Sequence, residues 1–288
     1  MSIELAPATP EMFEDVYPVL AVFEKNNPRL QKRHFRNLFH YPWAAPDDRR
    51  GYVLKDDGRV VGFQALIAHE RLVEGRRVPI ANFSSWVVLP GYRAYSMLLN
   101  QIPPDPELTV TSLTPLKQLE PYQRSVGALP LETRQRVILP VPSLSRIFSG
   151  AGWKVTSRIE QHRAVLTEQE WQIYQDHRPL ECRHLLAFKQ DRHCYLVSVR
   201  MKGRRRYFSH LLHVGDPDVF VEALEKIRIA LLFQNRTPLI ILDERLLHGR
   251  PTPASRPIAL HTPRVFKSSV LTAEQLDNLY SEFVLLPF

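Results

Sequence analysis

Apolar runs interrupted by glycine and proline predict paired strands in the first half of the chain. Residues 51–56 and 59–67 are two such runs joined by Asp57-Gly58, a dipeptide typical of a two-residue hairpin turn. Residues 71–73 and 78–88 predict a second hairpin that turns at Glu74-Gly75. The pattern therefore favours an antiparallel sheet as the centre of this half.

The residues before these hairpins predict one strand followed by helical structure. Residues 3–9 form a short strand-like segment, and Thr9-Pro10 is a typical helix start, with a capping residue followed by proline. Apolar residues then recur at helical intervals at Phe13, Val16, Tyr17, Leu20 and Phe23. Pro18 falls inside this pattern, so we expect the helix to be kinked or interrupted there.

Residues 87–99 are the most informative segment. An apolar strand ends at Pro90-Gly91, and a helix is expected to begin with Arg93. The N-terminus of a helix presents unpaired N–H groups and a partial positive charge, both of which favour an anion. The segment therefore predicts a place where the phosphates of a cofactor bind.

Two further elements follow at short distance. Residues 108–113 read as a β-branched strand, and residues 115–128 as a helical turn that ends at Gly127. Tyr122 lies in that turn.

Together these segments resemble the acyl-CoA-binding part of the GNAT acyltransferase superfamily. In that family a strand ending in Val-x-Pro leads to Arg-x-x-Gly-x-Gly; here Val88-Leu89-Pro90 leads to Arg93, with Ser96 and Leu98 in place of the two glycines. The resemblance implies that acetyl-CoA or another acyl-CoA is a substrate. It also implies a set of residues that hold this substrate: Val88, Leu89, Arg93, Ala94, Tyr95, Ser96, Met97 and Leu98.

The resemblance also implies catalytic residues. Residues 121–128 are similar to the family's Phe-Tyr-x-x-x-Gly-Phe ending with one extra residue, and Tyr122 matches the tyrosine that protonates the departing CoA thiolate. A phenol suits this role because it stays protonated at neutral pH. Ser84 is the second catalytic candidate, on a strand where family members often carry a glutamate base. The base stays open: water held by Asn82, Ser84 or Ser85 is one option, and Glu70 or His69 is another.

The order of elements in residues 1–145 is that of a GNAT domain, so we expect an α/β fold with a mixed, mostly antiparallel central sheet flanked by helices. Residues 146–288 partly repeat this order. Residues 193–200 and 206–214 predict a hairpin turned at Lys202-Gly203, followed by a helix from Asp216 and a strand at residues 238–243. We therefore expect two GNAT-like halves that arose by duplication.

The second half lacks an equivalent of the Arg-x-x-Gly-x-Gly motif. Asp216 and Asp218 stand at the predicted helix start, where carboxylates cap a helix but repel a phosphate. We expect no CoA site in this half and an architectural role, such as closing the acceptor groove.

Composition narrows the classes of function. The chain has 288 residues, a net charge of +8, 24 prolines and 11 glycines, so a phosphate cradle rich in glycine is not expected. The basic run from Lys202 to Arg206 could bind nucleic acid, the 3′-phosphate of CoA or an acidic glycan, although a solvated turn is the commoner explanation at this position. It lacks the aromatic pattern that would favour nucleic acid. Cys182 and Cys194 lack the spacing of metal ligands, and His210 and His213 lie on opposite faces of a strand, so no metal site is predicted.

Two functions remain. The first is an acyltransferase that moves an acetyl or other acyl group from acyl-CoA to an amine or hydroxyl of a small-molecule or glycan acceptor. The alternative is a non-catalytic, degenerate GNAT-fold protein for binding or assembly. No apolar run is long enough to span a membrane and no basic-then-apolar leader is seen, so we expect a cytoplasmic protein. The oligomeric state is left open, a homodimer included.

Overall fold

The computed structural model describes residues 2–44, 49–73, 75–100, 105–141, 152–203 and 206–287. Contacts divide the chain into two compact units. Unit 1 comprises Met1–Leu131, Arg264–Thr272 and Tyr280–Phe288, and unit 2 comprises Glu132–Pro263 and Ala273–Leu279. The residues from Arg264 to Phe288 are thus divided between the two units. A single boundary at residue 145 would place all of them in the second half.

Unit 1 contains a mixed, mostly antiparallel sheet. Its strands are β1 (Ile3–Ala8), β2 (Gly51–Asp56), β3 (Arg59–Val73), β4 (Arg76–Val88), β5 (Thr109–Ser112) and the end of β12 (Ser255–Lys267), in the order β1-β2-β3-β4-β5-β12. All neighbours are antiparallel except β4 and β5, which run parallel. The prediction of a mixed, mostly antiparallel sheet is therefore confirmed.

The predicted hairpin turn between β2 and β3 has the geometry that its sequence favours. Asp57 and Gly58 both have positive φ, 46° and 83°, as a tight hairpin requires. The turn predicted between β3 and β4 keeps Gly75 at φ 80°, while Glu74 lies outside the described residues.

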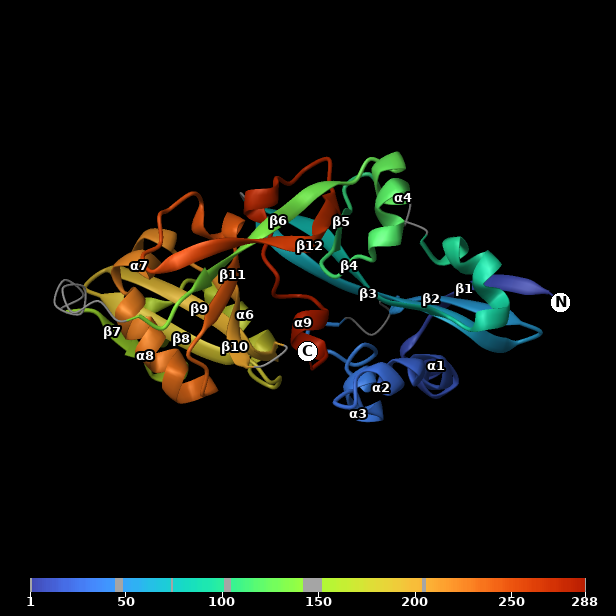
Figure 1. The fold of residues 1–288 in the computed structure, drawn as a ribbon, viewed down its shortest axis with the longest axis horizontal. Helices are drawn as coiled ribbons and strands as arrows, with labels where there is room; N and C mark the ends of the chain where they lie inside the picture. The colour runs from blue at the N-terminus through green and yellow to red at the C-terminus, as the bar shows by residue number, and fades with distance from the viewer. Residues whose placement is uncertain are drawn as a thin grey trace. The chain divides into compact units, whose positions relative to one another are not determined.

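Helices cover both faces of the unit 1 sheet. On one side lie η1 (Pro10–Met12), α1 (Phe13–Leu20), α2 (Val22–Asn26), α3 (Lys32–Arg36) and α9 (Glu282–Leu285); α4 (Glu120–Ser125), preceded by η3 (Lys117–Leu119), lies on the other (Figure 1). Phe13, Val16 and Leu20 of α1 are buried, as their spacing predicts. α1 continues through Pro18 and ends at Leu20, and a new helix begins at Val22, so the interruption lies three residues beyond the proline rather than at it.

In unit 2 the strands of the sheet follow the order β6 (Leu129–Ile138), β11 (Ile240–Asp243), β10 (Tyr207–Val214), β9 (Arg192–Lys202), β8 (Arg183–Lys189) and β7 (Lys154–Thr156). β10 and β11 run parallel, and the other neighbours run antiparallel. Read from β7 to β6, these strands repeat the sequence of strand directions of unit 1, read from β1 to β12. The remaining elements are η4 (Ile159–Val165), α6 (Glu168–His177), α7 (Pro217–Glu222), α8 (Leu224–Asn235), η5 (Glu244–Leu247) and η6 (Ala273–Gln275).

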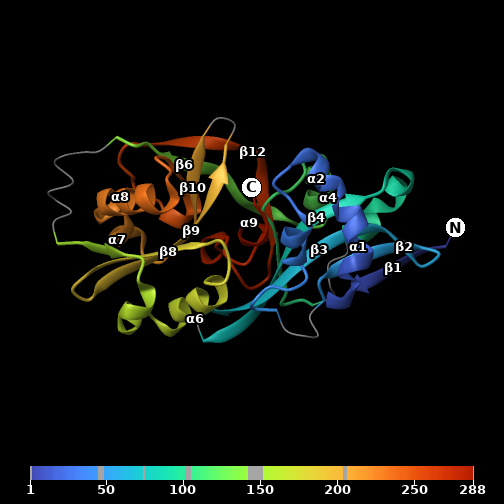
Figure 2. The ribbon, with the colours of Figure 1, turned by 90° about the horizontal axis from the view of Figure 1, so that it is seen from below.

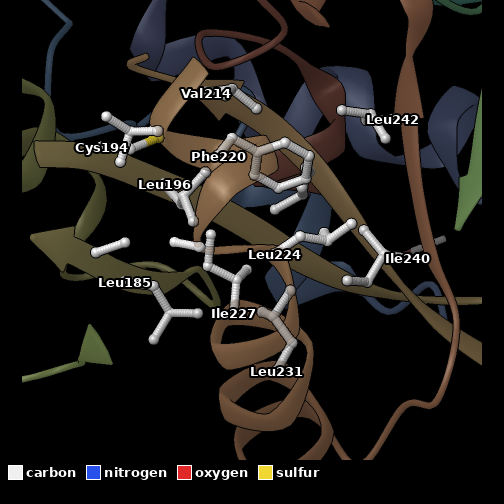
Figure 3. Close-up of a cluster of buried hydrophobic side chains, with 14 of the residues drawn as sticks. Leu185, Cys194, Leu196, Val214, Phe220, Leu224, Ile227, Leu231, Ile240 and Leu242 are labelled. Carbon is white, nitrogen blue, oxygen red and sulfur yellow. The ribbon is translucent and has the colours of Figure 1, made fainter. Parts of the chain in front are cut away.

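An apolar core joins one face of this sheet to α7 and α8. Leu185 of β8 and Leu196 of β9 pack with Phe220, Leu224 and Ile227 of the two helices, and all five side chains are at most 1% exposed (Figure 3). α6 lies on the opposite side of β8 and β9 (Figure 2). Among the described residues, no helix combines the length and the apolar character that crossing a membrane requires.

The side of β8 and β9 that faces α6 carries buried polar side chains. His184 Nδ1 lies 2.8 Å from the Tyr195 hydroxyl, and the ring of Tyr174 from α6 packs edge-on against His184. Burial disfavours the charged imidazole and lowers the pKa of His184 to about 4. The folded protein therefore contains a neutral histidine where the unfolded chain has one that titrates normally.

This burial predicts a loss of stability in acid. Because the folded pKa lies below the ordinary value of 6.5, the unfolded state binds more protons as the pH falls from about 6.5 to about 4, and stability is lost across that window. The shift corresponds to about 3 kcal/mol. We expect His184→Gln to reduce the difference in unfolding free energy between pH 7 and pH 4, measured by urea denaturation. The exposed His261→Gln is the control; an unchanged pH dependence in His184→Gln would contradict the assignment.

Candidate active site

The parallel pair β4 and β5 separates soon after it forms. Only Ile80, Ala81 and Asn82 of β4 pair with β5, opposite Thr109, Val110 and Thr111. β4 continues to Val88, whereas β5 ends at Ser112. Beyond Asn82 the side of β4 that faces β5 therefore has backbone groups without a strand partner among the described residues.

A cavity of about 230 Å³ occupies this divergence, within unit 1. Its walls come from both strands, from α4 on one face of the sheet and from Phe23 of α2 on the other. The lining is mostly apolar with a few polar groups, an arrangement typical of small-molecule sites. The lining residues are Phe23, Gln64, Phe83, Ser84, Ser85, Trp86, Asn100, Val110, Thr111, Ser112, Thr114, Pro115, Leu116, Leu119, Tyr122, Gln123, Val126, Ala128, Val265, Phe266 and Lys267.

A bulge in β4 shapes one wall. Ser84 pairs with Ala65 and Val87 with Phe63, so that Ser85 and Trp86 together stand opposite Gln64. Ser85 has a φ of 51°, the left-handed region that few residues other than glycine adopt. A bulge locally reorients the backbone and its side chains. It does so here at the cavity.

The structure brings both predicted catalytic residues to this cavity. Ser84 is 6% exposed, and its Oγ lies 3.4 Å from Ser85 Oγ. Tyr122 lies on α4, and its hydroxyl donates a hydrogen bond to the carbonyl oxygen of Asn100 at 3.0 Å. α4 ends as predicted, with Gly127 at φ 81°.

Two polar atoms at the cavity wall lack partners. Gln64 Oε1, an acceptor, and Asn100 Nδ2, a donor, are both buried without a hydrogen-bond partner in the described structure. Gln64 is only 4% exposed. Burying such groups unpaired costs free energy, so a ligand with one donor and one acceptor, as in an amide, would satisfy both.

The expected phosphate-binding helix has a different geometry. Residues Pro90–Asn100 form a 3₁₀-helix, η2, rather than an α-helix. A 3₁₀-helix places residues three apart on one face, and Leu89, Tyr92 and Tyr95 have that spacing and pack with buried Leu99 against the sheet. The sequence predicted a helix beginning with Arg93; the structure has a helix here, but it begins at Pro90 and is of the 3₁₀ type.

The eight predicted cofactor-binding residues do not line the cavity. Val88, Leu89 and Tyr95 pack in the apolar cluster around Leu99, and the Leu89 amide donates to the Val61 carbonyl at 2.9 Å. The Ser96 carbonyl accepts a hydrogen bond from Trp86 Nε1 at 3.3 Å. The other four, Arg93, Ala94, Met97 and Leu98, are exposed. That the eight residues bind phosphate stays a prediction. Arg93, whose side chain is exposed, is the positively charged residue among them.

The bases considered from the sequence lie elsewhere. Glu70 is exposed and forms an ion pair with Arg77 at 3.0 Å, and His69 stacks on Tyr280 with ring centres 4.3 Å apart. Asn82 is buried and donates a hydrogen bond to the carboxylate of Glu282. Sequence reasoning missed Glu282; its one signal was a lone carboxylate within the apolar run from Tyr280 to Leu286.

In unit 2 the corresponding helix start is occupied by the protein itself. Asp216 caps α7, and its carboxylate accepts from the amides of Asp218 and Val219 at 2.8 and 3.0 Å. Asp218 pairs with Arg250. The predicted capping role of Asp216 is thus confirmed. Of the basic run, Arg204 and Arg205 lie outside the described residues.

His210 and His213 contact different groups. His210 lies near Met201 and Gln135, and His213 lies 3.4 Å from Asp277. The described residues contain no cluster of three or more side chains suited to a metal ion.

Comparison with known proteins identifies the fold. No family model and no curated protein matches the chain. Among solved structures, a GCN5-related N-acetyltransferase from Anabaena variabilis matches with 14% identity and a TM-score of 0.54, covering 92% of this chain and 72% of that one. One from Kribbella flavida matches with 13% identity and a TM-score of 0.52, covering 93% and 72%. A conserved Enterococcus faecalis protein described as a probable N-acyltransferase matches with 10% identity and a TM-score of 0.55, covering 95% and 74%.

These similarities define the class of fold, which is the one seen in N-acyltransferases. More specifically, the chain has the fold of the GCN5-related N-acetyltransferase (GNAT) superfamily, as the sequence resemblance implied. At this level of identity the likeness shows the fold, so activity has to be argued from the site.

The unpaired Oε1 of Gln64 predicts opposite effects of a substitution on stability and on binding. Gln64→Leu removes a buried acceptor without a partner, so we expect the free protein to be more stable by up to about 1–2 kcal/mol, with weaker binding of acetyl-CoA. Thermal unfolding and calorimetry measure the two effects. The control is Gln135→Leu, which should destabilise because Gln135 Nε2 already donates to Asp243 at 3.1 Å. A destabilised Gln64→Leu protein with unchanged binding would show that Gln64 has only a structural role.

Proposed function

We propose that unit 1 is an acyltransferase domain that transfers an acetyl or other acyl group from acyl-CoA to an amine or hydroxyl acceptor. One observation supports this above all: the cavity where β4 and β5 diverge holds both Ser84 and Tyr122 and is lined from both faces of the sheet. Acyl-CoA and acceptor would therefore meet in one cavity, next to both candidate catalytic side chains. Holding two reactants in one place makes their reaction effectively unimolecular and lowers its barrier.

The free backbone edge and the unpaired atoms suit acyl-CoA. The pantetheine arm of CoA contains amides, which can pair with the exposed edge of β4, with Gln64 Oε1 and with Asn100 Nδ2. The apolar walls suit the acyl chain and the thioester. Arg93, exposed on η2, is the cation we assign to the phosphates.

The cavity supplies groups for the attack on the thioester and for the departure of the thiolate, while the proton that the acceptor loses passes to a base or to water. The acceptor attacks the thioester carbonyl, an amide at the β4 bulge donates to the developing oxyanion, and the carbon–sulfur bond breaks. The Tyr122 hydroxyl gives its proton to the departing thiolate. To do so it exchanges its present hydrogen bond to Asn100 for one to sulfur.

A non-catalytic binding role is the second candidate. It is favoured by the 3₁₀ geometry of η2 and by the Leu89 amide, which already donates to Val61. Release of CoA from acetyl-CoA in the presence of amine acceptors separates the two functions, because only the enzyme produces free thiol.

Arg93→Glu tests the phosphate assignment. The change removes a favourable charge contact and adds a repulsive one, so we expect acetyl-CoA binding to weaken at least tenfold, about 1.4 kcal/mol. Calorimetric titration of the folded variant measures it. Arg256→Glu makes the same charge change at an exposed position of unit 2 and should leave affinity unchanged. Equal affinity in both variants would contradict the assignment of Arg93.

Tyr122→Phe tests the chemistry. The ring is kept and only the hydroxyl is lost, so we expect turnover to fall roughly 10²- to 10⁴-fold with little change in affinity for acetyl-CoA. The rate of CoA release with an accepted amine is the measurement. Tyr17→Phe, which removes a hydroxyl that donates to Glu24, is the control. Turnover equal to that of the unmodified protein would leave Tyr122 as a packing residue.

A further inference from the structure

Glu282 is a buried carboxylate close to the cavity. It is 1% exposed and begins the short helix α9, which Ser281 caps. Unit 1 holds this segment at several points: Asn37 Nδ2 donates to the Leu285 carbonyl at 3.0 Å, and Asn27 Nδ2 to the Pro287 carbonyl at 3.4 Å. The position of the carboxylate is therefore fixed by the surrounding structure.

Hydrogen bonds connect this carboxylate to the cavity wall. The Thr114 hydroxyl donates to Glu282 Oε1 at 2.6 Å, and Asn82 Nδ2 donates to Oε2. The Thr111 hydroxyl donates to Asn82 Oδ1 at 3.1 Å. Thr111 and Thr114 both line the cavity, and Asn82 is the last residue of β4 that pairs with β5. Glu282 thus lies directly behind the wall where the strands diverge.

The electrostatic surroundings suit a base. Burial disfavours the charged form and raises the pKa of Glu282, while the hydrogen bonds and the nearby Arg264 of β12 favour that form. Arg264 packs over the Phe283 ring at 4.6 Å and is the charged side chain that acts on Glu282; Asn82 and Thr114 are neutral. A carboxylate with a raised pKa is a stronger proton acceptor than one in water.

We propose that Glu282 accepts the proton of the acceptor through the hydroxyl of Thr114. This inference rests on the proposed acyltransferase function. As the acceptor nitrogen bonds to the acyl carbon and the carbon–sulfur bond breaks, the nitrogen gives its proton to Thr114 Oγ1. The hydroxyl proton of Thr114 passes to Glu282 Oε1, and Tyr122 protonates the thiolate. After release of the products, Glu282 returns its proton to solvent and Tyr122 regains one.

In this relay Glu282 does not touch the acceptor and acts on it only through Thr114. Loss of turnover alone would not distinguish this role from a structural one, so the test includes a pH profile. The assay uses acetyl-CoA with spermidine, lysine and glucosamine as probe acceptors and measures released CoA. We expect turnover of the unmodified protein to fall as the pH drops through the pKa of Glu282, at a pH above that of an ordinary glutamate. In Glu282→Gln, turnover at neutral pH should fall roughly 10²-fold or more, the acid limb should disappear, and the KM for acetyl-CoA should change little.

Substitutions at Thr114 test the relay without touching the buried charge. Thr114→Ser keeps the hydroxyl and should retain turnover, whereas the isosteric Thr114→Val should lose it to the same extent as Glu282→Gln. Thr109→Val is the matched control: Thr109 is buried on β5 and bonds to Ser268 Oγ at 2.6 Å, away from the cavity. Its turnover should be unchanged. If Glu282→Gln does not fold, the contrast between serine and valine at position 114 decides.

The outcomes separate the relay from the function on which it rests. Equal turnover and an unchanged pH profile in Glu282→Gln, or equal turnover in Thr114→Ser and Thr114→Val, would overturn the relay and leave the acyltransferase intact. Absence of turnover by the unmodified protein with every probe acceptor would overturn both.

Discussion

The parallel pairing of β4 and β5 over three residues, followed by their separation, is the constraint on which the site depends. While paired, the strands fix Asn82 beside Thr111; once separated, they leave an unpaired strand edge and a cavity that residues from both faces of the sheet line. A parallel pair requires a connection that crosses the sheet, which η2 provides here. The bulge in the β3–β4 pair at Ser85 and Trp86 reorients the backbone of β4 where it lines the cavity.

Local sequence signals predicted the elements that local interactions form. Asp57-Gly58 specified a hairpin because both residues tolerate positive φ, and Pro18 predicted an interruption that falls three residues later, between α1 and α2. Ser84 and Tyr122 could be named as candidates because each lies on a predicted element within or next to the segments that carry the resemblance, and both line the cavity; their catalytic roles stay predictions. The start and the type of the helix after Pro90 were not specified by the sequence: it begins at Pro90, before Arg93, and is a 3₁₀-helix.

Contacts between distant segments could not be read from the sequence. Glu282 reaches Asn82 and Thr114 although 200 and 168 residues separate them along the chain. Likewise, the strand beside β5 is the end of β12, and the strand beside β11 is β6, so each unit includes a strand from the other part of the chain. No local periodicity specifies such partners, because a strand pattern shows which face is buried and not which strand lies next to it. The repeated order of strand directions agrees with the expected duplication, which stays a prediction.

Backbone hydrogen exchange with and without acetyl-CoA tests the central claim most directly, because it needs neither an acceptor nor turnover. If the diverging edge of β4 in unit 1 binds acyl-CoA, amides of residues 83–88 should exchange more slowly when acetyl-CoA is present. Amides of residues 214–219 in unit 2, where Asp216 caps α7, should exchange at an unchanged rate. Protection at residues 214–219 without protection of β4, or no protection at either place at millimolar acetyl-CoA, would contradict the account.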